Sequence, residues 1–138
     1  MSPAPRSTAA GAAVSAVEMM AAGSPLEDVW RYAIVQLLDD YTSVLRREGT
    51  EVAAPMFAER PDSTGDVRVD AALAALAEHL ARRDGWPAPA WATEPGRETR
   101  EWWFVTELRA FHPRALVESP LSFRKRGVFV TRDALERV

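Results

Sequence analysis

The chain has 138 residues, of which 47% are hydrophobic and 27% are charged, and its formal net charge is −3. This composition fits a single globular domain with a real core, and no apolar run approaches the ~20 residues that a membrane-spanning helix needs. The absence of cysteine excludes disulfides, thiolate nucleophiles and cysteine-ligated metals, and it favours the cytoplasm. The Ala-rich beginning lacks a leucine-rich core, so we expect no export signal.

The charge is distributed unevenly along the chain. Residues 1–97 carry 14 acidic and 9 basic side chains, whereas residues 98–138 carry 6 acidic and 8 basic ones. Proteins that wrap nucleic acid normally present a strongly cationic surface. An acidic body with a mildly basic end therefore favours self-docking, or contact with an acidic patch of a partner, over nucleic acid.

Residues 1–23 predict a flexible or weakly helical N-terminal arm, and residues 24–138 predict a single helical domain. Within the arm, residues 8–22 have a high helix propensity because they are rich in alanine. The apolar face of such a helix would consist only of Val14, Val17 and Met20.

The clearest helix is predicted to begin at Ser24. The sequence Ser24-Pro25-Leu26-Glu27 has the pattern of a capping box, with Ser at the N-cap and Glu at N3. Apolar residues then recur at steps of three and four until Leu45, and Gly49 predicts the end of the helix. Residues 50–65 follow as a connector with an apolar anchor pair, Met56 and Phe57.

A second helix is predicted from about Asp66 to Asp84, with Gly85 closing it. Leucines and a valine form one face, and alanine fills many of the other positions, so a neighbouring helix can approach closely. Glu78 and Arg82 have the i,i+4 spacing of a helical ion pair.

Residues 85–97 predict an irregular strap, because Pro87, Pro89 and Pro95 remove backbone donors. Trp86 and Trp91 are expected to pin this strap onto the helices. Three shorter helical pieces are then predicted at about 98–111, 113–118 and 120–126. They are followed by a β-prone segment, 128–130, and a last turn, 132–138, capped by Thr131.

The predicted fold class is therefore mostly α: a compact helical domain of about five helices with a Pro/Trp-rich strap and little or no β structure. Adjacent aromatic residues cannot share one helical face, so only one of Trp102 and Trp103 is expected to point inward. The sequence leaves open which one it is.

No arrangement of residues in the sequence indicates catalysis, and we expect neither enzyme activity nor a bound cofactor or metal. His79 and His112 are far apart in the sequence, and Asp39 and Asp40 are adjacent on a helix, so their carboxylates point roughly 100° apart. Phosphate-binding glycine loops and the nucleophile elbow are absent. Residues 76–85 have the pattern of the first helix of a helix-turn-helix, but the proline-rich strap stands where a recognition helix should follow.

The C-terminal segment contains the candidate partner-binding residues Trp102, Arg124, Lys125, Arg126 and Phe129. Trp and Arg contribute most to the energetics of protein interfaces, and Arg grips carboxylates with two hydrogen bonds. We therefore expect a non-catalytic protein-binding module. Two alternatives stay open: a small nucleic-acid-binding regulator that uses this C-terminal basic patch, and a solvated helix end whose cations bind nothing.

Several sequence features are shared with known proteins: residues 75–83 (ALAEHLARR), the strap pattern Gly85-Trp86-Pro87 with Pro89-Ala90-Trp91, the cluster at 102–104, and residues 118–130. With these features the second half of the chain resembles a family of small, largely uncharacterised actinobacterial proteins, often encoded beside nucleotidyltransferase-like toxins. The resemblance implies an antitoxin-like role in a toxin–antitoxin system, in which the chain binds and neutralises a partner protein. It implies no catalytic residues.

Overall fold

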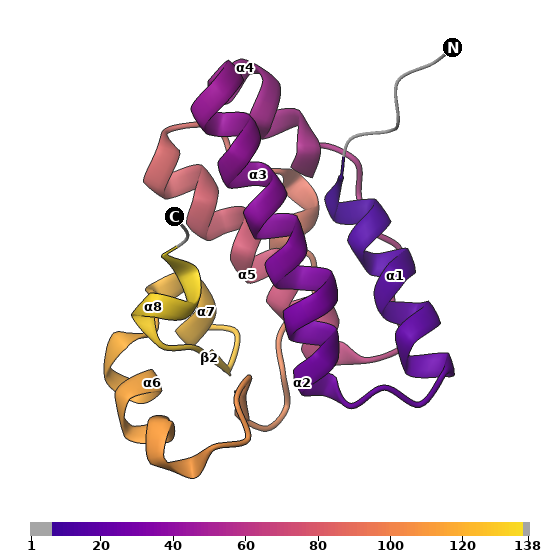
Figure 1. Cartoon of the computed structure of the whole chain (residues 1–138), viewed down its shortest axis with the longest axis vertical. Helices are drawn as coiled ribbons and strands as arrows, with labels where there is room; N and C mark the ends of the chain where they lie inside the picture. Colours follow the sequence, from indigo (N-terminus) through magenta and orange to yellow (C-terminus); the bar gives the residue numbers. More distant parts are fainter. Residues whose placement is uncertain (1–6, 137–138) are drawn as a thin grey trace.

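The computed structural model describes residues 7–136 and is mostly helical (Figure 1). The α-helices are α1 (Ala9–Ala21), α2 (Leu26–Val29), α3 (Val35–Glu48), α4 (Thr50–Ala53), α5 (Val67–Asp84), α6 (His112–Glu118), α7 (Leu121–Arg124) and α8 (Arg132–Leu135). A π-helical turn, η1 (Trp30–Ile34), joins α2 to α3, and three 3-10 turns are η2 (Ala54–Phe57), η3 (Ala90–Thr93) and η4 (Arg109–Phe111). Two short strands, β1 (Trp103–Phe104) and β2 (Val128–Phe129), complete the fold. The predicted fold class is confirmed, although the helical residues are divided among more and shorter segments than expected.

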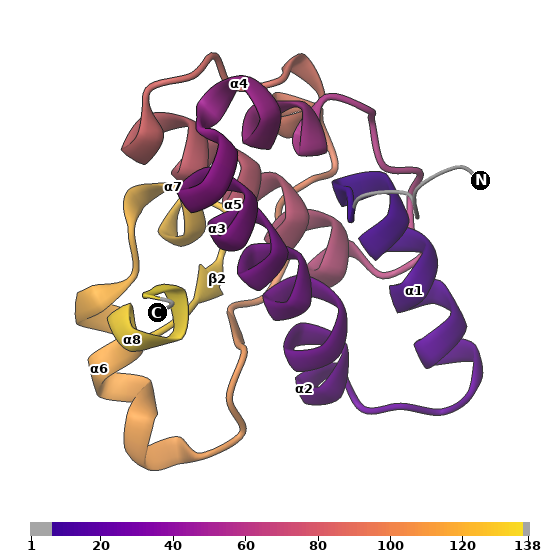
Figure 2. The same ribbon diagram turned by 45° about the horizontal axis from the view of Figure 1, so that its top comes forward.

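Helix α5 lies at the centre of the molecule and packs against α1, η1, η3 and α7 (Figure 2). Its N-terminus is capped by Asp66, whose side chain accepts a hydrogen bond from the Arg68 N–H, and Gly85 ends it in the left-handed conformation (φ 81°, ψ 32°). Most of its side chains are buried, including six alanines that are at most 2% exposed. Because small side chains occur on every face of α5, other segments can pack against it on all sides, and this explains its central position in the core.

The predicted helix from Ser24 to Gly49 is present as a continuous rod of α2, η1 and α3. The predicted capping box is wrong, because the helix begins at Leu26 without a side-chain cap. Glu27, the expected N3 partner, instead accepts a hydrogen bond at 2.7 Å from the backbone N–H of Glu107. A tertiary contact thus takes the carboxylate that a local motif would have used.

The helix predicted within the N-terminal arm is present as α1, and Thr8 caps it by accepting a hydrogen bond from the Gly11 N–H. Its predicted apolar face is wrong for two of its three residues: Val14 and Val17 are 58% and 43% exposed, whereas Met20 packs against the core. The buried face consists of alanines that join the common core: Ala9, Ala12, Ala13 and Ala16. Alanine is buried here in preference to valine because α1 packs against the alanine-rich α5, and small side chains let the two helices approach more closely.

The predicted helix at 98–111 is wrong. Most of this segment is irregular, with η4 at its end, and β1 pairs in parallel with β2, with Trp103 opposite Val128. The Trp103 N–H donates to the Gly127 carbonyl at 2.8 Å, a bond that replaces the helical one. Because neighbouring residues of a strand point to opposite sides, Trp102 is 67% exposed while Trp103 packs edge-on against Trp30.

The rest of the C-terminal lobe (residues 98–136) follows the prediction more closely. Helices α6 and α7 occupy the predicted segments 113–118 and 120–126, and the β-prone residues form β2. Thr131 is at the N-cap of α8 as predicted but makes no capping hydrogen bond through its side chain, and residues 137–138 of the predicted last turn lie outside the described part of the chain. Within residues 7–136, every helix falls short of the length and apolar character that crossing a membrane would require.

Candidate binding groove

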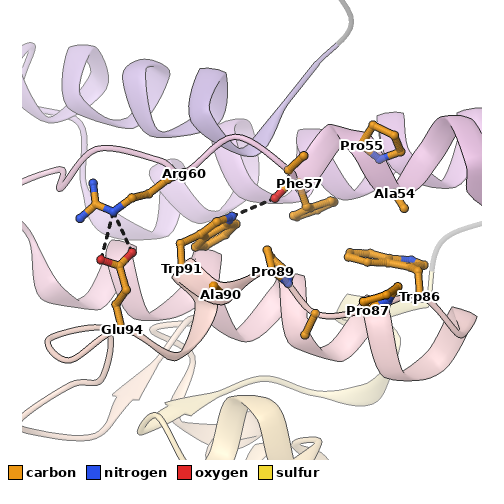
Figure 3. Close-up of a pocket in the computed structure, with 12 residues that line it drawn as sticks. Ala54, Pro55, Phe57, Arg60, Trp86, Pro87, Pro89, Ala90, Trp91 and Glu94 are labelled. Atoms are coloured by element: carbon orange, nitrogen blue, oxygen red, sulfur yellow. Dashed lines mark hydrogen bonds and ion pairs between the residues drawn. The ribbon is translucent and has the colours of Figure 1, made fainter.

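An open groove with a volume of about 760 Å³ lies between η2 and the strap (residues 85–97) (Figure 3). Its lining consists of ten apolar residues and two charged ones: Ala54, Pro55, Phe57, Ala58, Arg60, Trp86, Pro87, Ala88, Pro89, Ala90, Trp91 and Glu94. The predicted anchor pair positions one wall, because Met56 and Phe57 are buried and hold η2 on the core. The other wall is the strap, which the two tryptophans fix to the helices as predicted.

Both tryptophans of the groove use their indole N–H groups inside the protein. The Trp91 Nε1–H donates to the Phe57 carbonyl at 2.8 Å, and the Trp86 Nε1–H donates to the Tyr41 hydroxyl at 2.8 Å. The Tyr41 hydroxyl in turn donates to Asp84 at 2.6 Å. Burial, together with this hydrogen bond, raises the pKa of Tyr41, so the hydroxyl remains a donor. The half-buried Trp86 and the small exposed part of Trp91 thus present apolar ring surface without a free indole N–H.

An ion pair closes one end of the groove, far from Trp86 (Figure 3). The Arg60 Nε–H lies 2.8 and 3.0 Å from the two carboxylate oxygens of Glu94. The hydrogen bond from Arg60 lowers the pKa of Glu94. Behind it, the buried Arg97 stacks over the Trp91 ring at 5.1 Å and donates to the Pro61 carbonyl at 2.7 Å. Charged groups therefore sit at the rim, and they are already paired with each other.

The basic run 124–126, predicted as a partner-binding edge, does not form one exposed patch. Arg126 is only 5% exposed, and it donates to Glu78, to the Ser122 carbonyl and to the Ala92 carbonyl. Lys125 lies 2.6 Å from the same Glu78 carboxylate. The predicted Glu78–Arg82 pair is therefore replaced by a tertiary clasp between α5 and the end of α7.

Glu78 is held ionised by this clasp. Burial opposes its ionisation, but the hydrogen bonds from Lys125 and Arg126 outweigh that effect and lower its pKa from 4.5 to about 2. The carboxylate offsets one of the two positive charges, and the burial of Arg126 leaves Lys125 as the exposed cation of this clasp.

The other predicted partner-binding residues are divided between surface and core. Arg124 is exposed, but its guanidinium donates to the Leu116, Val117 and Ser119 carbonyls and closes the end of α6. Phe129 is 3% exposed and lies under the exposed Trp102 ring, at a centroid distance of 5.0 Å. Trp102 is accompanied on the C-terminal lobe by further exposed apolar side chains, namely Leu108, Phe111, Leu116, Val117 and Leu121.

The histidines have structural surroundings. His79 lies edge-on to Phe123 at 6.0 Å, and burial lowers its pKa. His112 stacks on Phe104 at 4.1 Å, and its Nε2 is 2.9 Å from the Thr106 carbonyl oxygen. Neither of them lines the groove. In the described part of the chain, residues of the metal-binding types do not gather into any group of three or more that could hold an ion.

The sequence predicts the strap but not the groove beside it. The spacing Trp86-Pro-Ala-Pro-Ala-Trp91 shows that two rings flank small residues, which is a signal for an uncovered apolar surface. What the sequence could not show is that η2, about thirty residues earlier, faces the strap. Comparison with protein-family models, curated proteins and solved structures found no match to the chain.

Proposed function

We propose that the protein is a non-catalytic protein-binding module that holds an apolar surface of a partner in the groove between η2 and the strap. The observation that carries the proposal is the combination of an open apolar groove with aromatic walls whose polar atoms are all bonded internally. Exposed apolar surface of this kind, rimmed by charge, is typical of interaction sites. A small-molecule site would need polar groups aimed inward to orient its ligand, and here the charged pair lies at the rim.

The resemblance to actinobacterial proteins encoded beside toxins supplies the proposed partner. A nucleotidyltransferase-like toxin is the expected binding protein, and the chain would act as its antitoxin-like inhibitor in the cytoplasm. We do not extend the proposal to nucleic acid. Lys125 and Arg126 share the one carboxylate of Glu78, and Arg126 is buried, which leaves less of the surface charge that phosphate binding requires.

The proposal is tested by capture with matched surface variants. The tagged protein is used to purify partners from nuclease-treated lysate of the native host, and each captured protein is then purified and titrated against the bait. Ala88→Arg places a long charged side chain at the exposed strap position in the groove, whereas Ala110→Arg does so at an exposed position of η4. We expect a stoichiometric complex that survives nuclease, is lost with Ala88→Arg and is kept with Ala110→Arg.

Two results would count against the proposal. Loss of the complex with Ala110→Arg alone would place the binding surface on the C-terminal lobe. Material that disappears after nuclease treatment would instead support the nucleic-acid-binding regulator. The antitoxin part is tested separately, by co-expression with the neighbouring toxin: growth should be restored by the wild type and not by Ala88→Arg.

A further inference from the structure

The groove offers a bound chain few hydrogen-bond donors, and this restricts what can occupy it. Pro87 and Pro89 alternate along the strap, so the N–H groups that one edge of an extended segment would present are missing. Pro55 adds a further position without a donor on the opposite wall. The indole N–H groups of Trp86 and Trp91, which could otherwise donate to a ligand, are bonded to Tyr41 and Phe57.

An extended partner segment would therefore bury its backbone in this groove without compensation. Strand addition needs a row of free N–H and C=O groups, and a polyproline segment has no internal hydrogen bonds to satisfy its carbonyls. An α-helix satisfies its own backbone and presents only side chains to its neighbour. The chemistry of the walls thus favours a helix whose apolar residues recur at i, i+3 or i+4, and i+7.

The charges at the closed end indicate which polar residues the helix would carry. Glu59 stands between two lining residues and is exposed, and the side chain of Asp62 is fully exposed next to them. Together with Glu94 they give three carboxylates against two cations, Arg60 and the buried Arg97, which both pair with Glu94. This excess of negative charge is complementary to a basic side chain at the corresponding end of the helix.

We infer that the occupant of the groove is the apolar face of an amphipathic α-helix of a partner protein, oriented with a Lys or Arg toward the Arg60–Glu94 end. This inference rests on the proposed function and specifies the partner surface that the module recognises. The aromatic rings and prolines supply the apolar contact, and the acidic rim selects the direction in which the helix lies.

A display selection with two peptide libraries tests the inference. One library contains helix-forming peptides with one randomised face, and the other contains proline-rich extended peptides. Both are selected together on the full-length protein, and the winners are then titrated against Ala88→Arg, whose folding is checked by circular dichroism and thermal melting. We expect groove-dependent winners with apolar residues at helical spacing and a basic end, and a gain of helicity when they bind. Their affinity should fall at least tenfold with Ala88→Arg and several-fold with Glu59→Lys/Asp62→Lys.

The alternative results are distinguishable. Groove-dependent winners that are proline-rich, or that show no helical spacing, would overturn the inference and leave the binding module standing. Winners that bind Ala88→Arg as well as the wild type, or an absence of winners, would overturn both. Self-association of the wild type in sedimentation experiments, abolished by Ala88→Arg, would show that a second copy occupies the groove, and this too would overturn the inference.

Discussion

Replacing Glu78 by glutamine should reveal how strongly the clasp between α5 and α7 stabilises the fold. The carboxylate is 5% exposed and accepts hydrogen bonds from Lys125 and Arg126. Its pKa falls from 4.5 to about 2 on folding, and this interval is equivalent to about 3 kcal/mol of folding free energy at neutral pH. Glu78→Gln keeps the shape but removes the charge, and it leaves the buried Arg126 without its counter-ion.

The sign of the pH dependence follows from the direction of the change in pKa. A carboxyl group with a lowered folded pKa stabilises the protein fully above about pH 4.5, and this contribution is lost as the pH falls toward 2. Urea unfolding of wild type and Glu78→Gln should therefore differ by roughly 3 kcal/mol at pH 7, and by less than half of that at pH 3.

Glu51→Gln, at an exposed position of α4, is the matched control and should unfold within about 0.5 kcal/mol of the wild type at pH 7. The stabilising role of the clasp would be refuted if the unfolding free energies of wild type and Glu78→Gln differed little at pH 7, or if their difference stayed the same down to pH 3. The first result would mean that Lys125 and Arg126 do not depend on Glu78, and the second that Glu78 does not titrate through the clasp.

Three further predictions concern the core and its turns. Leu76→Ala, fully buried on α5, should cost ~2–5 kcal/mol in urea unfolding, whereas Trp102→Ala, on the surface, should cost less than about 1 kcal/mol; equal costs would mean that the core is misplaced. Because burial lowers the pKa of His79, stability should fall as the pH drops below about 6.5, the value in the unfolded chain, and His79→Gln should remove this loss; parallel curves for both proteins would contradict the assignment. Gly127→Ala should destabilise by ~1–3 kcal/mol more than Gly85→Ala, since both glycines have positive φ but only at Gly127 would the new Cβ collide with Thr99; equal melting temperatures would argue against that close contact.

The helices that the sequence predicts well are those whose signals are local. The stripe between Leu26 and Leu45 and the helix from Asp66 to Gly85 combine a 3.6-residue period with an appropriate end. The face of α1 was mispredicted because hydrophobicity favours valine, whereas burial against the alanine-rich α5 favours small side chains. Helix type is thus encoded locally, but the buried face depends on the partner helix.

The C-terminal lobe shows where a local reading fails. Residues 98–111 have an acceptable helical composition, yet their backbone groups pair with β2, about twenty-five residues later. Likewise, three consecutive cations are read as a surface patch when nothing nearby neutralises them. Glu78, which pairs with two of them, lies nearly fifty residues away, so its effect on Lys125 and Arg126 appears only in three dimensions.

The same internal bonds that secure the strap also determine what the groove can recognise. The indole N–H of Trp86 donates to Tyr41 and that of Trp91 donates to the Phe57 carbonyl, so neither N–H is available to a ligand. This commitment fixes both rings without help from a ligand, so little ordering entropy remains to be lost on binding. Selectivity for a partner must then come from three features: the shape of the groove, its lack of hydrogen-bond partners for an extended main chain, and the acidic rim near Glu94. A rigid wall with few donors suits side chains better than extended main chain, and for that reason we infer a helix as the partner surface.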